Sequence, residues 1–308
     1  MKRTKTAVAA TAAVGLFALG ACGGGNDPLA EQSAAPGGTA ASGSVVVGSA
    51  NFPENELLAE IYAGALTAKG VNVSKKLNIA SRETYVPALN AGEIDLIPEY
   101  TGNFAKYLNK DATVTDEAGA LEALRAALPE NLVALEPSKA QNKDSVVVTK
   151  ETADQYSLKS ISDLAPHAAQ LVLGGPAEWK ERPDGIPGLE RVYGLKFKEF
   201  KPLDSAGSLT VQALKNGQVQ AANLFSTDPN IAANGFVVLD DPENLFGSQN
   251  VVPVMTKSKA TPEVTEALDA VSAKLDTDSL TGLVKEVVID KKDSAAVAQE
   301  WLKTNSLG

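Results

Sequence analysis

The chain has 308 residues, of which 44% are hydrophobic and 21% charged, so it can bury one or two ordinary globular cores. Its formal net charge is −10, and we see no basic cluster beyond the first five residues. A nucleic-acid-binding face needs Lys and Arg to neutralise phosphates, so this class of protein is excluded.

The N-terminus has the layout of a secretory signal peptide. A cationic start precedes an uncharged apolar stretch, residues 7–20, which is too short to span a bilayer comfortably. The stretch ends in Leu-Gly-Ala-Cys at residues 19–22, which resembles the lipobox of bacterial lipoproteins. In that family the Cys receives a diacylglyceryl group and becomes the new N-terminus. We therefore expect residues 1–21 to be a signal peptide and Cys22, the only Cys, to be lipidated.

Residues 22–43 are expected to hold the lipidated Cys and a flexible tether. Gly, Ala, Ser and Pro dominate this segment, and such residues cannot bury enough apolar surface to offset the entropy of ordering. A random coil of this length reaches about 25 Å. The sequence therefore predicts a globular protein held at the outer face of the cytoplasmic membrane by its lipid anchor.

From residue 45 onward, strand and helix patterns alternate. A short apolar strand at residues 45–47 stops at Gly48, and apolar residues then recur at helical spacing from Leu57 to Leu66, before Gly70 at the expected C-cap. Further strands are predicted at residues 71–79, 94–97, 132–135, 146–149, 171–174, 219–224 and 236–239. Further helices are predicted at residues 84–91, 117–127, 207–216, 262–275 and 294–303. This alternation indicates an α/β fold with mainly parallel sheets.

Two segments of the chain correspond to each other. Residues 88–102 and 213–227 both read as a helix end, a Gly, a strand, and then an aromatic and a hydroxyl residue. The aligned pairs are Gly92 with Gly217, Tyr100 with Phe225, and Thr101 with Ser226. Because ligands of open α/β sheets bind at the carboxyl ends of strands, two such units predict two half-sites, one in each of two lobes. Alternatively, the match is a chance repetition of a common helix–Gly–strand pattern.

Four runs of sequence carry a resemblance to a known family. They are GSANFPENELLAEIYAGAL, SRETYVPALNAGEIDLIPEYTGN, PAEWKERPDGIPGLERVYGLKF and NLFSTDP. In this order they resemble the osmoprotectant substrate-binding proteins of ABC importers, of the glycine betaine, choline and carnitine type, over essentially all of residues 44–308.

The resemblance implies a type II periplasmic-binding fold with two α/β lobes that close like a clamshell. By analogy, lobe I comprises residues 44–143 plus 252–308, and lobe II comprises residues 144–251. It further implies a monomeric extracytoplasmic lipoprotein that delivers a small compatible solute to the permease subunits of an ABC importer.

In betaine-binding members of this family, tyrosines surround the quaternary ammonium, and Arg or Lys holds the carboxylate. Carried over to this sequence, Tyr100 is the cage tyrosine of lobe I. The other residues that the resemblance brings to the ligand are Thr101, Asn103, Asp144, Glu178 and Arg182. Phe225, with Ser226 beside it, is expected to form a pocket wall because it corresponds to Tyr100 in the internal match.

Three more residues are candidates by position. Asn51 and Phe52 lie between a strand and a helix, where free N–H groups favour anionic or carbonyl ligand atoms. Phe52 is equally consistent with a hydrophobic staple. Arg82 either reaches the ligand or pairs with Glu83 or Glu99.

The sequence departs from the family at several cage positions. Val146 and Phe225 stand where tyrosines are common, the aromatic-rich stretch before the return crossing reads FGSQN with Gln249, and Ala50 replaces a frequent Lys. Two lost aromatic contacts weaken a bound cation, so we expect weak or no glycine betaine binding. The alternatives are a neutral polyhydroxylated or phenolic ligand, or a clamshell surface receptor or adhesin without transport.

No enzymatic site is expected. The chain has no Cys/His cluster for a metal, no phosphate-binding loop, and a single His, His167, in a polar loop that suits no Ser-His-Asp triad. We therefore expect no catalytic residue, no metal and no cofactor.

Overall fold

The computed structural model of the protein describes residues 44–114 and 116–308. The signal peptide, the lipidated Cys22 and the tether, all expected within residues 1–43, lie outside the described residues. Within the described ranges, none of the helices combines the length and the apolar character that crossing a membrane requires.

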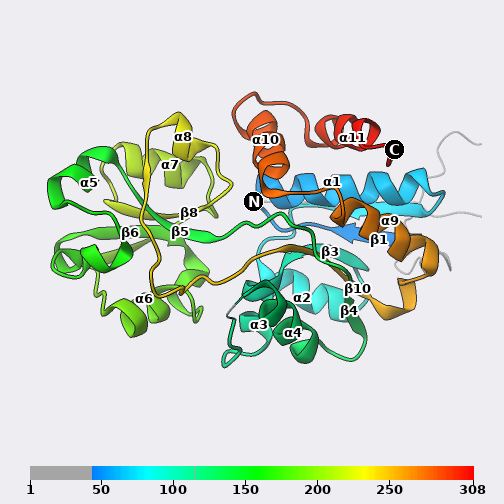
Figure 1. Ribbon diagram of the computed structural model, residues 1–308, viewed down its shortest axis with the longest axis horizontal. Helices are drawn as coiled ribbons and strands as arrows, with labels where there is room; N and C mark the ends of the chain where they lie inside the picture. The colour runs from blue at the N-terminus through cyan, green and yellow to red at the C-terminus, as the bar shows by residue number, and fades with distance from the viewer. Residues whose placement is uncertain (1–43, 115) are drawn as a thin grey trace, which may run out of the picture. The chain divides into compact units, whose positions relative to one another are not determined.

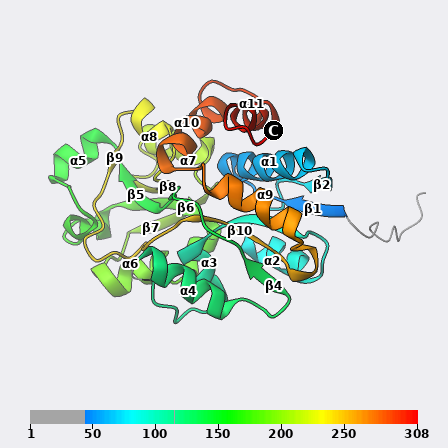
Figure 2. The ribbon, with the colours of Figure 1, turned by 45° about the vertical axis from the view of Figure 1, so that its right-hand side comes forward.

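The described residues form two five-stranded sheets, each flanked by helices, so the predicted two-lobed α/β fold is confirmed (Figures 1 and 2). The sheet of lobe I has the order β2-β1-β3-β10-β4 and the sheet of lobe II the order β7-β6-β8-β5-β9. The strands of the first sheet are β1 (Ser44–Gly48), β2 (Asn72–Lys76), β3 (Leu96–Tyr100), β4 (Leu132–Ala134) and β10 (Val251–Thr256). Those of the second are β5 (Asp144–Val148), β6 (Val172–Pro176), β7 (Glu199–Leu203), β8 (Ala221–Phe225) and β9 (Val237–Val238).

The helices fall between these strands in the sequence. Lobe I carries α1 (Pro53–Ala68), α2 (Arg82–Asn90), α3 (Thr101–Leu108), α4 (Glu117–Ala127), α9 (Pro262–Ser272), α10 (Thr277–Val288) and α11 (Ser294–Thr304). Lobe II carries α5 (Lys150–Tyr156), α6 (Ile186–Tyr193), α7 (Ser208–Lys215) and α8 (Asn230–Ala233). Short 3-10 helices are η1 (Ile161–Leu164), η2 (Ala168–Gln170), η3 (Ala177–Lys180) and η4 (Lys257–Lys259).

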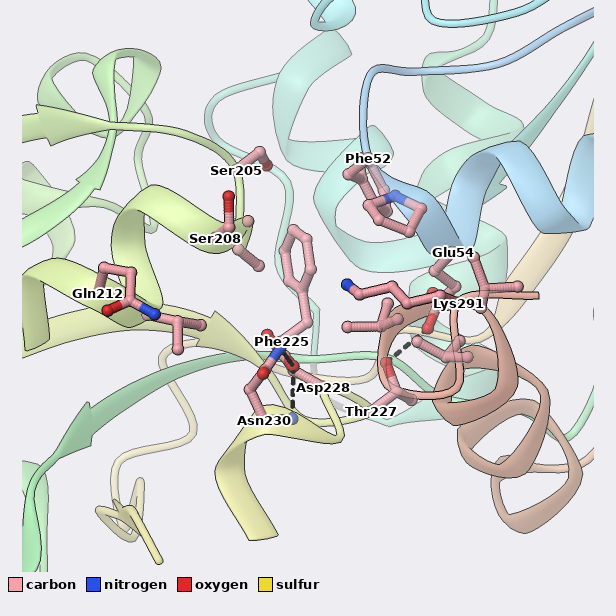
Figure 3. A pocket seen from close by; sticks show the side chains of 17 residues that line it. Phe52, Glu54, Ser205, Ser208, Gln212, Phe225, Thr227, Asp228, Asn230 and Lys291 are labelled. Carbon is pink, nitrogen blue, oxygen red and sulfur yellow. Dashed lines mark hydrogen bonds between the residues drawn. The ribbon is translucent and has the colours of Figure 1, made fainter. Parts of the chain in front are cut away.

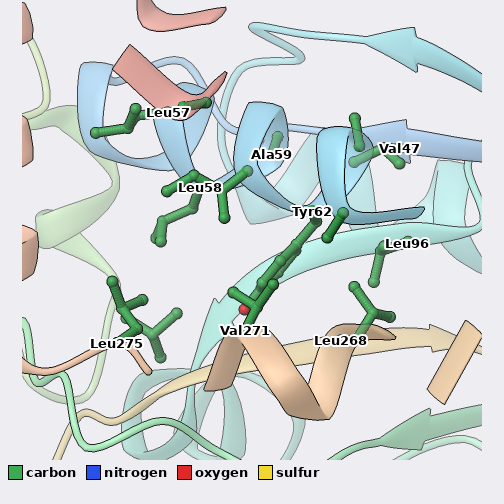
Figure 4. Packing of buried hydrophobic residues seen from close by; sticks show 14 of the residues in the cluster. Val47, Leu57, Leu58, Ala59, Tyr62, Leu96, Leu268, Val271 and Leu275 are labelled. Atoms are coloured by element: carbon green, nitrogen blue, oxygen red, sulfur yellow. The ribbon is translucent and has the colours of Figure 1, made fainter. Parts of the chain in front are cut away.

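Helix α1 occupies the core of lobe I. It starts with Pro53 at its first position and two acidic residues in its first turn, which suit the free N–H groups and positive dipole of a helix start. Figure 4 shows its apolar residues packed against those of β1, β3, α9 and the chain that follows α9. The labelled residues are Val47, Leu57, Leu58, Ala59, Tyr62, Leu96, Leu268, Val271 and Leu275. Each buried Leu of this kind contributes about 1.5–3 kcal/mol, so the start of α1 is firmly held.

The prediction of mainly parallel sheets is wrong. In lobe I, β1 runs parallel to β2 and β3, but β10 runs antiparallel to β3 and β4. In lobe II, β6 is parallel to β7 and β8, whereas β5 is antiparallel to β8 and β9. The reason is topological: β5 and β10 are the strands that follow the two crossings, so each enters its sheet from the other lobe.

The two corresponding segments, residues 88–102 and 213–227, have the same local structure. Gly92 (φ 71°) follows α2 and leads into β3, and Gly217 (φ 66°) follows α7 and leads into β8. A positive φ at a helix end favours Gly, which explains why both units have one there. β3 and β8 take the same central place in their sheets, and each ends on an aromatic residue, Tyr100 or Phe225.

The hydroxyl residues that follow these aromatics fasten the crossings. The Thr101 N–H donates to the Asn250 carbonyl at 3.0 Å, and the Asn250 N–H donates to Thr101 Oγ1 at 3.1 Å. In the other lobe, the Ser226 N–H donates to the Lys143 carbonyl at 2.8 Å, and the Lys143 N–H donates to Ser226 Oγ at 2.9 Å. Asn250 and Lys143 each directly precede a crossing strand, so the two hydroxyls have equivalent structural roles.

Candidate functional site

A cavity of about 180 Å³ lies between the two lobes, at the carboxyl ends of β3 and β8. We call it the central cavity. Nine of the predicted ligand residues line it: Asn51, Phe52, Arg82, Tyr100, Asn103, Asp144, Glu178, Arg182 and Phe225. Thr101 and Ser226 do not line it, because their side chains are directed to the crossings described above.

Aromatic rings from both lobes form much of the wall. Phe52 stacks on Tyr100 with ring centroids 6.2 Å apart, and it lies against Phe225 of lobe II with centroids 5.1 Å apart. Tyr85 of α2 and Trp179 of η3 also line the cavity. Rings with this spacing offer several π faces to a ligand that enters between the lobes.

The hydroxyl of Tyr100 is bound to a buried carboxylate. Glu54, at the start of α1, accepts hydrogen bonds from the Tyr100 hydroxyl at 2.7 Å, from Asn142 Nδ2 at 2.7 Å and from the hydroxyl of Thr227. In residues 44–114 and 116–308 no cation pairs with it. Burial raises the pKa of Glu54, and the nearby Asp228 adds to this, against the three hydrogen bonds. Because Thr227 belongs to lobe II, Glu54 also joins the lobes.

Asp144 is a second buried carboxylate without an ion pair in the described chain, and it lines the central cavity. Asn223 Nδ2 donates to its Oδ1 and Asn103 Nδ2 to its Oδ2, both at 2.8 Å. Burial raises the pKa of Asp144, and the charge of Asp184 raises it further, while the two amides and the charge of Arg182 oppose the shift. A negative charge held by neutral amides beside aromatic rings favours a positively charged ligand group.

Arg82 both lines the cavity and pairs with Glu99, which resolves the alternatives left by the sequence. Its Nε donates to Glu99 Oε1 at 2.9 Å and its Nη2 to Oε2 at 2.7 Å, a bidentate pair in which both residues are buried. Tyr85 donates its hydroxyl to the same carboxylate. Burial lowers the pKa of Arg82, but the charge and hydrogen bonds of Glu99, together with Tyr85 and Asp184, raise it by more, so the net shift is upward. These two N–H groups are therefore committed to Glu99.

Arg182 forms an ion pair between the lobes. Its Nη2 lies 3.3 Å from Glu83 Oε2 at the start of α2, while its buried Nε has no hydrogen-bond partner in the described chain. Glu178 lines the cavity from η3, four residues earlier. Arg182 thus retains an unused donor close to the central cavity.

Two of the backbone N–H groups between β1 and α1, which were expected to be free, already form hydrogen bonds within the protein. The Ala50 N–H donates to Asn55 Oδ1 at 2.7 Å, and the Asn51 N–H donates to the Ala80 carbonyl at 3.2 Å. Asn51 itself is exposed at the cavity edge. These two N–H groups are not available to an anionic ligand atom.

Among the lining residues that sequence reasoning missed are Tyr85, Asn142, Trp179 and Asn223. Strand periodicity could have found Asn223, because it lies two residues before Phe225 on the same face of β8. Helix periodicity could have found Tyr85, one turn after Arg82. Asn142 carries no local signal.

The two positions expected to have lost cage aromatics do not line the cavity. Val146 is fully buried in the core of lobe II. Gln249 is also buried: its Oε1 accepts from the Asn103 N–H at 2.8 Å, and its Nε2 donates to Asn103 Oδ1 at 2.8 Å. Gln249 therefore orients Asn103, which in turn binds Asp144.

Among residues 44–114 and 116–308, no group of His, Cys, Asp or Glu side chains is placed to hold a metal ion. What the site offers is aromatic faces, carboxylates, amides and guanidinium groups, including the unused Arg182 Nε, which suit the enclosure of a small polar molecule. The fold and site together define a two-lobed solute receptor of the type II periplasmic-binding class.

Comparison with known proteins identifies the family. Residues 43–304 match the family described as the substrate binding domain of ABC-type glycine betaine transport system, and the chain belongs to this family. The chain is 30% identical over 277 residues to the "Glycine betaine-binding protein YehZ" of Escherichia coli, an alignment that covers 85% of this chain and 91% of the relative. It is 26% identical over 243 residues to the "Carnitine transport binding protein OpuCC" of Listeria monocytogenes, with 77% and 78% of the two chains covered.

The solved structures agree. The chain superimposes on the "Crystal structure of glycine betaine/carnitine/choline ABC transporter" with a TM-score of 0.67 and 25% identity, covering 85% of this chain and 99% of that one. The protein is therefore a non-enzymatic, extracytoplasmic solute-binding component of an ABC importer of the glycine betaine and carnitine type.

Proposed function

We propose that this protein is a monomeric lipoprotein, anchored through Cys22, that captures a small quaternary-ammonium compound of the choline and carnitine kind for its importer and binds glycine betaine weakly. The observation that carries the proposal is the position of Asp144, a buried carboxylate whose hydrogen-bond donors are two neutral amides, at the wall of a cavity lined by aromatic rings.

The charges around the central cavity support a cationic ligand. The carboxylates of Asp144, Glu178 and Asp204 line it, against the guanidinium groups of Arg82 and Arg182. Since Arg82 already forms a bidentate pair with Glu99, it contributes little free positive charge. A cation over the rings gains about 0.5–2 kcal/mol per desolvated contact, and Asp144 adds to this attraction.

The same charges disfavour a short zwitterion. In glycine betaine the carboxylate lies close to the ammonium, so a cation held near Asp144 brings a second negative charge beside it. Arg182 Nε is an unused donor that could hold such a carboxylate, but its guanidinium is shared with Glu83. Choline lacks the carboxylate, and in carnitine it lies further from the ammonium. The expected weakness of glycine betaine binding thus rests on charge rather than on the number of rings.

A neutral polyhydroxylated or phenolic ligand is the second candidate, and two unpaired acceptors favour it. Asn142 Oδ1 and Asn223 Oδ1 are buried and have no hydrogen-bond partner in the described chain. Their orientation follows from chemistry, because each Nδ2 donates to a carboxylate, that of Glu54 or Asp144. Hydroxyl groups of a ligand would satisfy such acceptors if the side chains adjust on binding.

The anchor is supported by the sequence alone. The Leu-Gly-Ala-Cys run at residues 19–22 ends the apolar leader, and the polar segment that follows is long enough to hold the two lobes above a membrane.

A ligand panel tests the proposal. Thermal denaturation of the mature protein is followed with choline, carnitine, glycine betaine, inositol and a simple phenol. A cognate ligand at about 100 times its Kd stabilises the fold by about 2.7 kcal/mol, and this shifts the Tm by several degrees. We expect choline or carnitine to produce this shift at concentrations where glycine betaine does not. Uptake of the radiolabelled ligand, lost on deletion of the gene, separates transport from a role as a surface receptor or adhesin.

A further inference from the structure

A second cavity, of about 390 Å³, lies beyond the Phe52–Phe225 ring pair (Figure 3). We call it the α10 cavity, since Val284, Val287 and Val288 at the end of α10 and the following Lys291 form its lobe I side. Its lobe II side comes from the start of α7 and residues 225–230. It shares Phe52, Ser205 and Phe225 with the central cavity, so the ring pair is a wall common to both.

Asp228 gives this cavity an unsatisfied acceptor. The residue is only 8% exposed, and its Oδ1 accepts from the Asn230 N–H at 2.8 Å and from Asn230 Nδ2 at 2.9 Å. Its Oδ2 is buried and has no partner in the described chain. Burial raises the pKa of Asp228, and the charge of Asp204 adds to this, against the two hydrogen bonds from Asn230.

The other carboxylate of this cavity and the start of α7 do not have this free capacity. Glu54 also lines the cavity, but three donors already bind its oxygens. At the start of α7, the N–H groups of Leu209 and Thr210 donate to Asp204, both at 2.9 Å, so this helix start is not an open anion site. A positive ligand group would therefore bind at Asp228.

Lys291 provides the opposite charge from lobe I. It is exposed and lines the cavity, and in the described residues it forms neither an ion pair nor a hydrogen bond. In Figure 3 its side chain extends from the α10 side into the space between the lobes, toward the side that carries Phe225. Its ammonium group is free to bind a negative ligand group.

Much of the remaining lining is apolar, although Ser205, Ser208, Gln212 and Thr227 also contribute to it. Val211 of α7 and the three valines of α10, with the rings of Phe52 and Phe225, provide the apolar part. A short methylene chain placed there would remove apolar surface from water on both sides.

We propose that the α10 cavity is a second binding site, for a small zwitterion whose charges are separated by an apolar chain, with its ammonium at Asp228 and its carboxylate at Lys291. The proposal goes beyond the function assigned to the central cavity, because no step of it depends on the ligand bound there.

Site-resolved NMR tests the proposal, with δ-aminovalerate as the probe. Methyl signals of Val211, Val284, Val287 and Val288 report on the α10 cavity, and the indole N–H of Trp179 reports on the central cavity. We expect δ-aminovalerate to shift the valine methyls in a saturable manner. Valerate and pentylamine each lack one charged end. Their affinity should be lower than that of δ-aminovalerate by at least about tenfold.

Variants complete the test. Asp228→Asn and Lys291→Gln should each weaken the probe by about tenfold. Lys292→Gln, at the adjacent exposed Lys that pairs with Glu286 at 2.6 Å, should leave it unchanged. Because Lys291 is exposed, its variant does not threaten folding. The proposal is overturned if the valine methyls do not respond, if only Trp179 responds, or if Lys291→Gln binds the probe as tightly as the wild type.

Discussion

The hydroxyl of Tyr100 donates a hydrogen bond of 2.7 Å to Glu54, a buried carboxylate that also binds Thr227 of the opposite lobe. One side chain thus presents a ring to the central cavity while its polar end supports a contact between the lobes. Stability and ligand affinity should therefore respond differently to changes at Tyr100.

Replacing Tyr100 by Phe keeps the ring and removes one donor to Glu54. Leaving a buried carboxylate with one hydrogen bond fewer should cost about 1–3 kcal/mol in the free energy of unfolding, with a much smaller effect on affinity. Tyr100→Leu removes the ring as well, and choline affinity should fall by up to about thirtyfold. Urea denaturation and calorimetric titration measure the two effects. Tyr107→Phe is the control, since the Tyr107 hydroxyl makes only a 3.4 Å hydrogen bond to the Arg82 carbonyl.

The pKa of Glu54 predicts a pH dependence of stability. Because its folded-state pKa is raised above 4.5, the fold favours the protonated form. The stability that this provides is present below about pH 4.5 and is lost as pH rises through the folded-state pKa. Glu54→Gln has no carboxyl group at this position and should not lose this stability. As pH rises, the unfolding free energy of the wild type should therefore fall relative to that of Glu54→Gln.

Comparison with the wild type is needed because Asp144 and Asp228 also have raised pKa values and titrate in the same direction. Glu263→Gln is the matched control. Like Glu54, it follows a Pro at the start of a helix, but it is exposed. A pH-independent difference between wild type and Glu54→Gln would contradict the assignment.

The ion pair between Arg182 and Glu83 predicts a small shift of the equilibrium between open and closed lobes. With exposed fractions of 22% and 45% for the two side chains, the pair should contribute about 0.2–1 kcal/mol to closure. Glu83→Gln should therefore increase the radius of gyration of the unliganded protein in small-angle scattering, more at low salt than at high salt. Ligand should restore the smaller value. Glu93→Gln, at an exposed acidic residue of the same lobe, should not change it.

The lipid anchor makes a separate prediction. Cys22→Ala should move the protein from the membrane fraction to the soluble or secreted fraction, with ligand affinity unchanged. Mass spectrometry of membrane-purified protein should show a lipidated Cys22 at the N-terminus. Membrane-purified protein with an unmodified Cys22 would rule out the anchor.

Local patterns predicted the elements whose burial follows a simple period. The apolar repeat from Leu57 to Leu66 gave α1, and α4 was predicted with its observed bounds. Strand β10 was missed, although all its residues are buried, because Pro253 argues against a central strand. In the structure Pro253 lies opposite Pro98 of β3.

Some of the missed helices are short, such as α5 and α6. Helix α10 is longer, but its apolar spacing was not recognised in the sequence. Strand β7 was also missed. It lies at the edge of its sheet and is partly exposed, so its apolar residues do not alternate clearly.

The candidate site was predictable only in part. The resemblance pointed to Tyr100, Asp144 and Arg182, but no local pattern relates Asn103 or Asn223 to Asp144. These pairs are 41 and 79 residues apart in the sequence and meet only through the crossing strand β5. The structural roles of Thr101 and Ser226 were likewise invisible, because they depend on backbone groups of the two crossings.

The most direct test of the account is a calorimetric titration of wild type and Asp144→Asn with choline and glycine betaine. Asp154→Asn, at an exposed lobe II carboxylate paired with Lys150, is the control. We predict that wild type binds choline more tightly than glycine betaine, and that Asp144→Asn, while still folded by its thermal transition, weakens choline by at least about tenfold. Tight glycine betaine binding together with unchanged choline affinity in Asp144→Asn would contradict the account.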